Sequence, residues 1–303
     1  MKLATTTGDF DNYCDTYEEK ICCLHAAGFR YIDLNLYREL KDTDFTLCDN
    51  WKENILSLKK LATELGMEFV QAHSVGGNPL AKDEKWEMLV KSTIRSVEVC
   101  GMLGIPSTVV HAGWMPKIGK EEYFERNLEF FRRIFPAMEA TGVNVLIENS
   151  TKANMGDQYY FLTGADMKDF IRYAGHPLLH ACWDTGHANI EGHQYQDLVD
   201  LGEDLYGLHI NDNRGEKDEH IMPFCGTLNM DEVMHGLMDA GYKGVFTLEA
   251  TETLRPADYW LGNRHTYPQD QRLKNAPVFL KQEAEKLLFD TATYILDQYG
   301  LSE

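Results

Sequence analysis

Short apolar runs rich in β-branched and aromatic residues alternate with longer segments of helical spacing along the whole chain. The short runs predict eight strands, at residues 3–6, 31–36, 68–74, 107–112, 144–149, 178–184, 206–211 and 245–250. Apolar positions three and four residues apart predict eight helices, at residues 16–27, 51–65, 84–103, 121–140, 165–174, 195–201, 229–240 and 278–299. Five glycines each follow a predicted helix and precede a predicted strand, as helix C-caps often do: Gly28, Gly66, Gly104, Gly142 and Gly241.

This regular alternation predicts parallel βαβ units and therefore an α/β protein. The chain has 303 residues, and eight units of about 38 residues are close to an ordinary (β/α)8 barrel. No linker rich in Pro, Gly or Ser interrupts the alternation, so we expect residues 1–303 to form a single (β/α)8 TIM barrel domain. The alternative is a doubly wound open sheet, but no GxGxxG motif follows the first predicted strand.

Acidic and imidazole side chains stand at the ends of the last four predicted strands. Glu148, Asp184, His209 and Glu249 would meet at the carboxyl end of a closed barrel. Three carboxylates and one imidazole in one mouth would repel each other unless a cation lay between them. A divalent Zn, Mn, Co or Mg ion suits such a mixed oxygen and nitrogen site. The alternative is four separate, solvent-facing strand ends, which becomes less plausible for four successive strands.

Five further residues form a second group of candidates. His73 and His111 end the two strands predicted before this set, and His187 follows Asp184 by three residues. Asp218 and His220 lie in a long loop, at a spacing that lets two side chains chelate one ion. These five residues are expected to bind substrate or additional metal, with ordinary hydrogen-bonded polar groups as the alternative.

Two long connections and one aromatic residue are candidates for the walls of the pocket. Residues 211–229 and 251–274 follow the last two predicted strands, where long loops on a barrel are often functional. The second connection carries several large side chains and is predicted either to wall the pocket or to pack against another subunit of a homo-oligomer: Tyr259, Trp260, His265 and Tyr267. Trp114 is a candidate apolar wall for a sugar ring, with a core or rim position as the alternative.

Composition limits the class of partner. Hydrophobic residues make up 44% of the chain and charged residues 25%, which allows a substantial core. Asp and Glu number 48 against 29 Lys and Arg, and a net charge of -19 disfavours nucleic acid as a partner. The seven cysteines form no CxxC pair, and the N-terminus lacks the apolar stretch of a signal peptide. We therefore expect a soluble cytoplasmic protein without a membrane partner.

Several motifs in order resemble a known family. VVHAGW, VLIENS, CWDTGHANI, LHINDNRGEKDEH and GYKGVFTLEA are similar to the sugar phosphate isomerase/epimerase family of xylose-isomerase-like TIM barrels, which is related to endonuclease IV. In the epimerase branch, the resemblance implies that the four strand-end residues bind metal and that His187 contacts a substrate hydroxyl. In the endonuclease IV branch, it implies a three-zinc cluster held by His73, His111, Glu148, Asp184, His187, His209, Asp218, His220 and Glu249. Phe224 replaces a glycine that is common in the family, which leaves open the backbone of the loop that carries Asp218 and His220.

The leading hypothesis is a metal-dependent sugar or sugar phosphate isomerase or epimerase, with Zn or Mn favoured. It would act by proton transfer through an enediolate, with Glu148 and Glu249 as the catalytic acid and base. One alternative is a multinuclear zinc phosphoester hydrolase, and another is a barrel that binds a sugar without catalysis. The expected partner is a small sugar in each case except that of the hydrolase.

Overall fold

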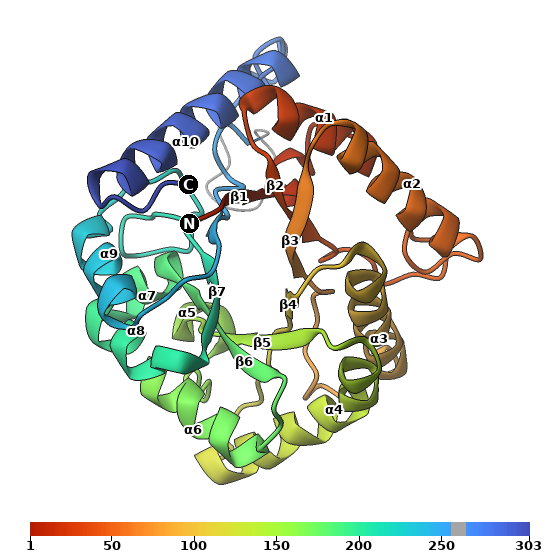
Figure 1. Cartoon of the computed structure of the whole chain (residues 1–303), viewed down its shortest axis with the longest axis vertical. Coiled ribbons are helices and arrows are strands. Elements are labelled where there is room, and N and C mark those ends of the chain that lie inside the picture. The colour runs from red at the N-terminus through yellow and green to blue at the C-terminus, as the bar shows by residue number, and fades with distance from the viewer. Residues whose placement is uncertain (256–264) are drawn as a thin grey trace.

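The computed structural model describes residues 1–255 and 265–303, and its eight strands form one parallel sheet in the order β7-β6-β5-β4-β3-β2-β1-β8. Directly after β7, Ile210 pairs with Leu248, the last residue of β8, and brings the two outer strands together. The strands are β1 Leu3–Thr6, β2 Tyr31–Asn35, β3 Glu68–His73, β4 Ser107–Val109, β5 Asn144–Glu148, β6 Leu179–Asp184, β7 Leu205–His209 and β8 Phe246–Leu248. The prediction of an α/β barrel with alternating strands and helices is confirmed (Figure 1).

The helices surround the strands (Figure 1). The longer ones begin and end within two residues of their predicted limits: α1 Tyr17–Ala27, α2 Trp51–Glu64, α3 Trp86–Leu103, α4 Lys120–Thr141, α6 Gly164–Ala174, α8 Tyr195–Leu201, α9 Met230–Asp239 and α10 Val278–Gln298. Four short elements escaped the periodicity analysis because each is too short for a repeating apolar face: η1 Thr7–Phe10, α5 Lys152–Met155, α7 Thr185–Glu191 and η2 Gly202–Asp204. Three of these follow strand ends and help to build the mouth of the barrel.

Local sequence explains where the helices begin and end. The Thr16 side chain accepts a hydrogen bond from the backbone N–H of Glu19, and the Glu19 side chain accepts one from the backbone N–H of Thr16. This capping box satisfies N–H groups that the first turn of α1 leaves unpaired. All five glycines predicted to terminate helices have positive φ, which residues with a Cβ rarely adopt.

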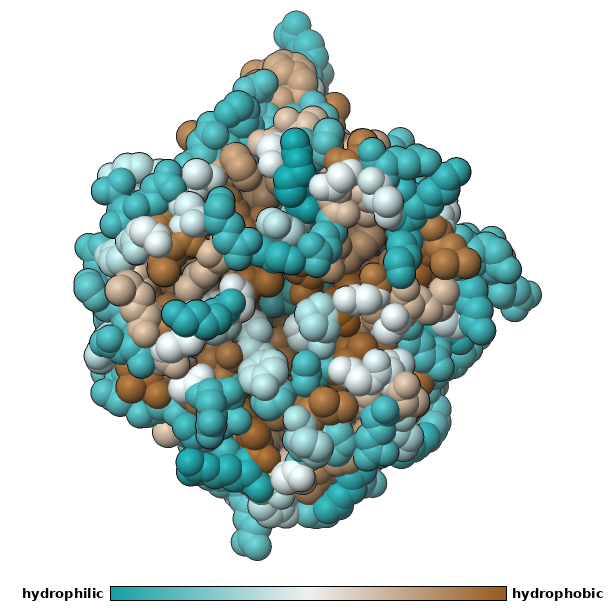
Figure 2. All heavy atoms as spheres, in the orientation of Figure 1, coloured by the Kyte–Doolittle hydropathy of each residue, from teal (hydrophilic) through white to brown (hydrophobic). Residues whose placement is uncertain are grey.

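The strands separate two apolar regions. The main core lies between the barrel and its helices and includes Trp183 and Phe246, both fully buried. Inside the barrel, a separate small cluster consists of Val109, Leu146 and Cys182. Figure 2 shows hydrophilic residues over much of the face that it draws, with hydrophobic atoms visible between them. Among the described helices, none combines the length and the apolar character needed to span a membrane.

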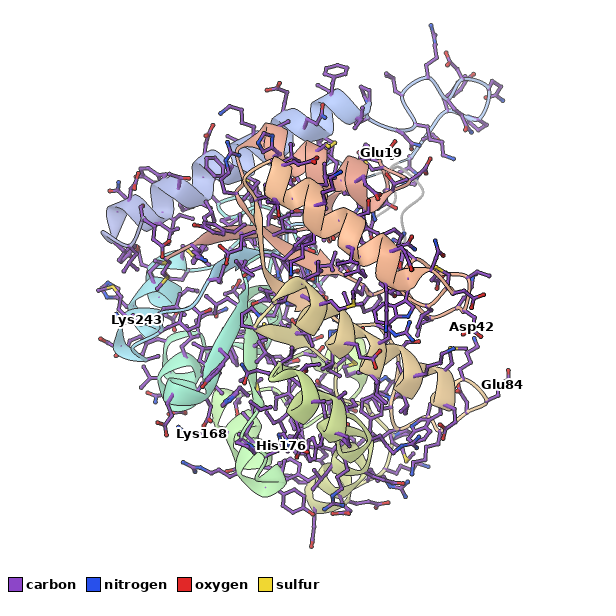
Figure 3. All side chains as sticks on the ribbon, turned by 45° about the vertical axis from the view of Figure 1, so that its right-hand side comes forward. Glu19, Asp42, Glu84, Lys168, His176 and Lys243 are labelled. Atoms are coloured by element: carbon purple, nitrogen blue, oxygen red, sulfur yellow. The ribbon has the colours of Figure 1, made fainter. Side chains whose placement is uncertain are left out.

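The two ends of the barrel can be distinguished in Figure 3. Asp42 and Glu84 lie in connections that follow β2 and β3, and they are on the right of this view. Lys243 lies in the turn that precedes β8, at the left of this view, and His176 lies in the turn that precedes β6, lower down and nearer the middle. In a parallel barrel the connections that follow the strands form the functional face, so the site must be sought on the side of Asp42 and Glu84.

Helix α6 packs unusually close to α8, and this contact supplies a test of the fold. A Cβ on Gly164 would lie 2.1 Å from the carbonyl oxygen of Asp197. We therefore expect Gly164→Ala to lower the free energy of unfolding by about 1–3 kcal/mol, because the backbone cannot yield without a shift of α8. Gly119→Ala is the matched control, since no atom lies within 4 Å of a Cβ at the N-cap of α4. Urea unfolding of both variants measures the difference, and equal midpoints would contradict the interpretation.

Candidate active site

Four side chains converge where β5, β6, β7 and β8 end. Glu148, Asp184 and His209 are the last residues of their strands, and Glu249 directly follows β8. One ligand atom from each of these four residues lies within 4.8 Å of the other three. Nδ1 of His209 lies 2.5 Å from Oε1 of Glu148 and 3.4 Å from Oε2 of Glu249. The structure thus brings the four residues into one buried cluster, as their positions at successive strand ends predict.

Asp184 both ends a strand and begins a helix. Its Oδ1 accepts a 2.7 Å hydrogen bond from the backbone N–H of His187, and its Oδ2 accepts a 2.8 Å bond from Nδ2 of Asn211. Gly186 makes room for this arrangement, because a Cβ there would lie 1.9 Å from Oδ1 of Asn211. The Asn149 amide bonds to both the N–H and the carbonyl of Asp184. Sequence analysis missed Asn149 and Asn211, although both are polar residues within two positions of a strand end.

A second cluster lies beside the first and is centred on Asp218. Its Oδ2 lies 3.1 Å from Nε2 of His187, and its Oδ1 lies 3.0 Å from Nε2 of His220. Asn154 donates a further 2.9 Å hydrogen bond to the same carboxylate. Ligand atoms of Asp184, His187 and His220 form another group within 4.8 Å of one another. The long loop after β7 therefore does reach the site.

Phe224 does not prevent this loop from folding toward the site. Its φ of 71° lies in the left-handed region that favours glycine, so the loop keeps this conformation at the cost of local backbone strain, and the side chain itself is 65% exposed. The Asp212 carboxylate accepts hydrogen bonds from the N–H groups of Gly226 and Leu228. Asp212 also pairs with Ile221 through two backbone hydrogen bonds. These bonds fix the loop without the family's glycine.

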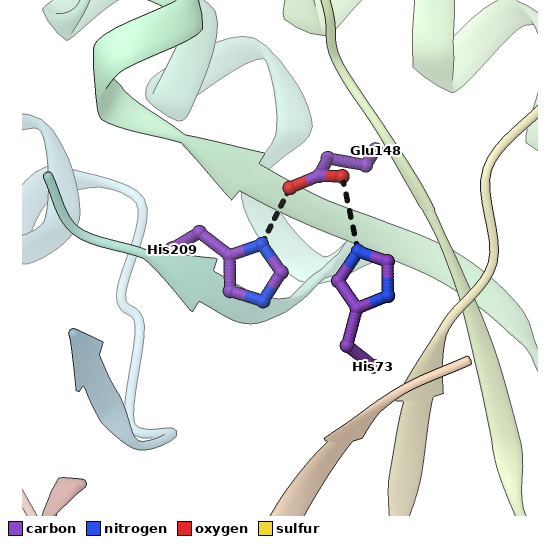
Figure 4. Close-up of side chains that lie close together, drawn as sticks. All are labelled: His73, Glu148 and His209. Atoms are coloured by element: carbon purple, nitrogen blue, oxygen red, sulfur yellow. Dashed lines mark hydrogen bonds and ion pairs between the residues drawn. The ribbon is translucent and has the colours of Figure 1, made fainter. Parts of the chain in front are cut away.

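Two histidines extend the site from β3 and from the connection after β4. His73 donates from Nδ1 to the Ser74 carbonyl at 2.7 Å, so its Nε2 carries a lone pair when the ring is neutral. Nε2 of His111 lies 3.1 Å from that nitrogen and 2.7 Å from Oε2 of Glu148. Figure 4 shows His73 and His209 directed toward the two oxygens of the Glu148 carboxylate. Glu148 therefore lies between imidazoles from several strands.

The buried carboxylates are balanced by imidazoles that hold protons. Burial acts to raise the pKa of Glu148, but the charges and hydrogen bonds of His209 and His111 outweigh it and hold this pKa well below its ordinary value. Burial raises the pKa of Glu249 to about 7, against the opposing charges of His209 and His220. Burial acts to lower the pKa of His209, but the negative groups around it, including Glu249 and Glu148, raise this pKa well above its ordinary value. Positive charge is thus required at the centre of the cluster.

The residues of the first cluster fit a divalent metal ion. Glu148, Asp184 and Glu249 offer carboxylate oxygens and His209 offers Nδ1, which is the mixed donor set that Zn²⁺ and Mn²⁺ accept. An ion of charge +2 would supply the positive charge that the protonated imidazole otherwise provides. All four residues are at most 8% exposed, so water cannot screen their mutual repulsion effectively.

A cavity of about 540 Å³ opens above the cluster, which is large enough for a small substrate. Tyr37, from the connection after β2, stands near His73 and His111, with ring centroids 5.5 and 5.9 Å away. Other described lining residues come from the end of β2 and from the connections after β1, β2, β5 and β8: Gly8, Asp11, Asn12, Asn35, Arg38, Ser150, Ala153, Asn154, Met155, Thr251 and Glu252. These connections bring polar groups over the clustered carboxylates and imidazole.

The expected aromatic walls are placed differently. Trp114 is not among the described lining residues of the cavity, and it is 39% exposed, which agrees with the rim position that was the alternative to a pocket wall. His265 and Tyr267 also lie away from this cavity. Tyr259 and Trp260 lie outside the described residues. Tyr37 is the aromatic residue that sequence analysis missed, and its place shortly after a strand end was the available signal.

Comparison with known proteins places the chain in a family. A model described as "Xylose isomerase-like TIM barrel" matches residues 24–275. An uncharacterized protein of Sinorhizobium fredii is 28% identical, over 85% of this chain and 86% of its own. Fructoselysine 3-epimerase of Escherichia coli O157:H7 is 24% identical, over 61% of this chain and 62% of its own. A probable endonuclease 4 of Cenarchaeum symbiosum is 27% identical, over 54% of this chain and 62% of its own.

Solved structures agree on the fold. D-psicose 3-epimerase, solved in the presence of D-fructose, has a TM-score of 0.73 at 16% identity, over 98% of this chain and 99% of that one. The IOLI protein with a bound zinc atom also has a TM-score of 0.73, at 17% identity over 99% of both chains. The strand order, the family model and these structures agree, and the chain belongs to the xylose isomerase-like TIM barrel family.

Proposed function

We propose that the protein is a divalent-metal-dependent sugar isomerase or epimerase. The observation that carries this proposal is the convergence of Glu148 and Glu249 on Nδ1 of His209 at the floor of a small polar cavity. Similarity to fructoselysine 3-epimerase, and a fold shared with D-psicose 3-epimerase, support a sugar as the substrate class. Glu148, Asp184, His209 and Glu249 would hold the ion.

Two carboxylates that flank a substrate can exchange a proton with a carbon beside a carbonyl group. One of Glu148 and Glu249 would remove the proton, and the other would return one to the opposite face in an epimerase. Their environments already differ, because the pKa of Glu148 is held well below its ordinary value while that of Glu249 is raised to about 7. A divalent ion, when bound, supplies Lewis-acid stabilisation of the charge that develops on oxygen as an enediolate forms. His187 would hold a substrate hydroxyl near Asp218.

A zinc-dependent phosphoester hydrolase is the second candidate. It is favoured by the additional ligand groups around His187 and His220 and around His73, which provide enough donors for more than one ion. Similarity to a probable endonuclease 4 points the same way. The net charge of -19 argues against DNA, and Arg38 is the one Lys or Arg among the described lining residues of the cavity.

Replacement of either catalytic carboxylate should abolish most turnover and spare the fold. Glu148→Gln and Glu249→Gln remove the proton acceptor but keep the side-chain shape, so we expect a loss of about 10²–10⁴-fold. The measurement is deuterium exchange from water into the carbon beside the carbonyl of ketohexoses such as D-fructose, followed by NMR. Glu64→Gln, at a 60% exposed side chain on α2, is the matched control. Wild-type exchange in both site variants would reject the assignment, and no exchange in the wild type with any sugar would favour a binding protein.

Metal content separates the two enzyme classes. Elemental analysis of the purified protein should find close to one zinc or manganese ion per chain if the first cluster alone is used. Asp184→Asn should then release most of that ion, because the cluster loses one of its three negative charges. Close to three ions per chain, with hydrolysis of a phosphodiester, would support the hydrolase instead.

Metal affinity should rise with pH. Since the pKa of Glu249 is raised to about 7 in the ion-free protein, a proton competes for this ligand below pH 7, and the proton on His209 competes above it as well. For each proton that the ion must displace, the apparent affinity for zinc falls about tenfold when the pH drops by one unit. Zinc titrations between pH 6 and 8.5 should therefore show a steeper dependence below about pH 7 than above it. A constant affinity over this range would contradict the proposed ligand set.

A further inference from the structure

A ring of inward-facing residues lies directly beneath the site. Side chains two positions apart on a strand point to the same face, so each site residue has a partner one step deeper in the barrel. On β4, β5 and β6 these deeper residues are apolar and form the internal cluster of Val109, Leu146 and Cys182. On β2, two residues before the cavity-lining Asn35, the deeper residue is Asp33. An acid is unusual here, because barrel interiors are normally filled by branched apolar residues.

The Asp33 carboxylate is buried without a well-formed hydrogen bond. Its exposure is 0%, and neither oxygen has a donor in good hydrogen-bond geometry among the described residues. Burial of an acid with so little compensation is costly, so such a group calls for an explanation. Burial raises the pKa of Asp33 to about 6, and the influences that oppose that rise are, in order, the charge of His209 and the side chains of Thr6 and Gln71. The largest positive influence on Asp33 is therefore a proposed ion ligand.

His209 has a buried ring nitrogen that can donate a hydrogen bond to such an acceptor. Its Nδ1 faces Glu148 and Glu249, and its Nε2 is buried without a well-formed hydrogen bond among the described residues, the Cys182 thiol being the other group that interacts with this ring. If Nδ1 binds an ion, the proton of the neutral ring must sit on Nε2. Metal-binding imidazoles almost always donate that second N–H to a carboxylate, a carbonyl oxygen or water, which fixes the ring.

The space between β2, β3 and β7 is polar at this level. Gln71 pairs in register with Asp33, and its Nε2 donates a 3.2 Å hydrogen bond across the barrel to the carbonyl of Leu208. Gly207 provides room for this crossing, because a Cβ there would lie 2.8 Å from Oε1 of Gln71. The acid on β2 and the imidazole on β7 thus face one internal polar region, which is also where a buried water would find partners.

We propose that Asp33 is a positioning residue whose carboxylate accepts the Nε2–H of His209, directly or through one buried water, and so holds Nδ1 toward the ion. The inference rests on the proposed metal-dependent function. Asp33 touches neither substrate nor ion in this role. It sets the orientation and the proton position of one ligand.

Zinc affinity and the stability of the ion-free protein together test this role. Asp33→Ala should weaken zinc binding about 10–100-fold, the usual effect of removing such a partner. Asp33→Asn keeps an acceptor oxygen without the charge and should lose less. Because the acid has no well-formed hydrogen bond in the ion-free protein, Asp33→Ala should leave the thermal unfolding temperature of that form unchanged or higher. A purely structural role would lower it. Cobalt-loaded Asp33→Ala should also have a visible absorption spectrum that differs from that of the wild type.

Two control variants exclude rival explanations. Thr247→Val changes another buried and unpartnered polar group of the same ring, on β8, and should leave zinc affinity unchanged. Cys182→Ala tests the other group that influences His209 and should also bind zinc like the wild type. Wild-type zinc affinity in Asp33→Ala, or an equal loss in Thr247→Val or Cys182→Ala, would overturn the inference. Deuterium exchange judges the proposed function separately: a wild type that binds zinc without exchange rejects that function, while the affinity comparison still decides the role of Asp33.

Discussion

The structure depends on charge compensation at the carboxyl end of the barrel. Three carboxylates, from Glu148, Asp184 and Glu249, are buried around the imidazole of His209. Such a cluster is unfavourable in a low-dielectric environment unless protons or a cation neutralise it. The hydrogen-bonded histidines supply protons in the ion-free protein, and an ion of charge +2 would replace them. The same electrostatic constraint therefore governs both the stability of this buried cluster and the chemistry that it can support.

The barrel geometry meets this constraint with few irregularities. Parallel strands end at one face, and their two-residue periodicity directs alternate side chains inward. The four clustered strand-end residues occupy the upper ring, and Asp33 lies in the ring below it. The lower ring is apolar on the side of β4, β5 and β6, and polar near Gln71, where Gly207 leaves space for a side chain to cross. This division gives the site a rigid floor on one side and hydrogen-bonding groups on the other.

Much of this arrangement could be predicted from the sequence, because strand ends and helix punctuation are local signals. Glu148 and Glu249 could be selected since each ends an apolar run. Tyr37 also directly follows a predicted strand, but its place beside His73 and His111 depends on how the connection after β2 folds over the barrel. Asp33 lies inside an apolar strand, and without the closed sheet nothing shows that its side chain lies inside the barrel rather than among the helices. Phe224 left the backbone of the loop after β7 open, and the structure gives this residue a positive φ and an exposed side chain.

Asp184 is shared between a helix and the site, and this has a chemical consequence. Both of its oxygens already accept N–H bonds, one from the first turn of α7 and one from Asn211. Hydrogen bonds and the positive end of a helix withdraw electron density from a carboxylate. Asp184 would therefore donate less electron density to a bound ion than an ordinary carboxylate does. An ion that it held would keep more of its electrophilic character. The short helix α7, which carries His187, therefore tunes the acidity of the site as well as its shape.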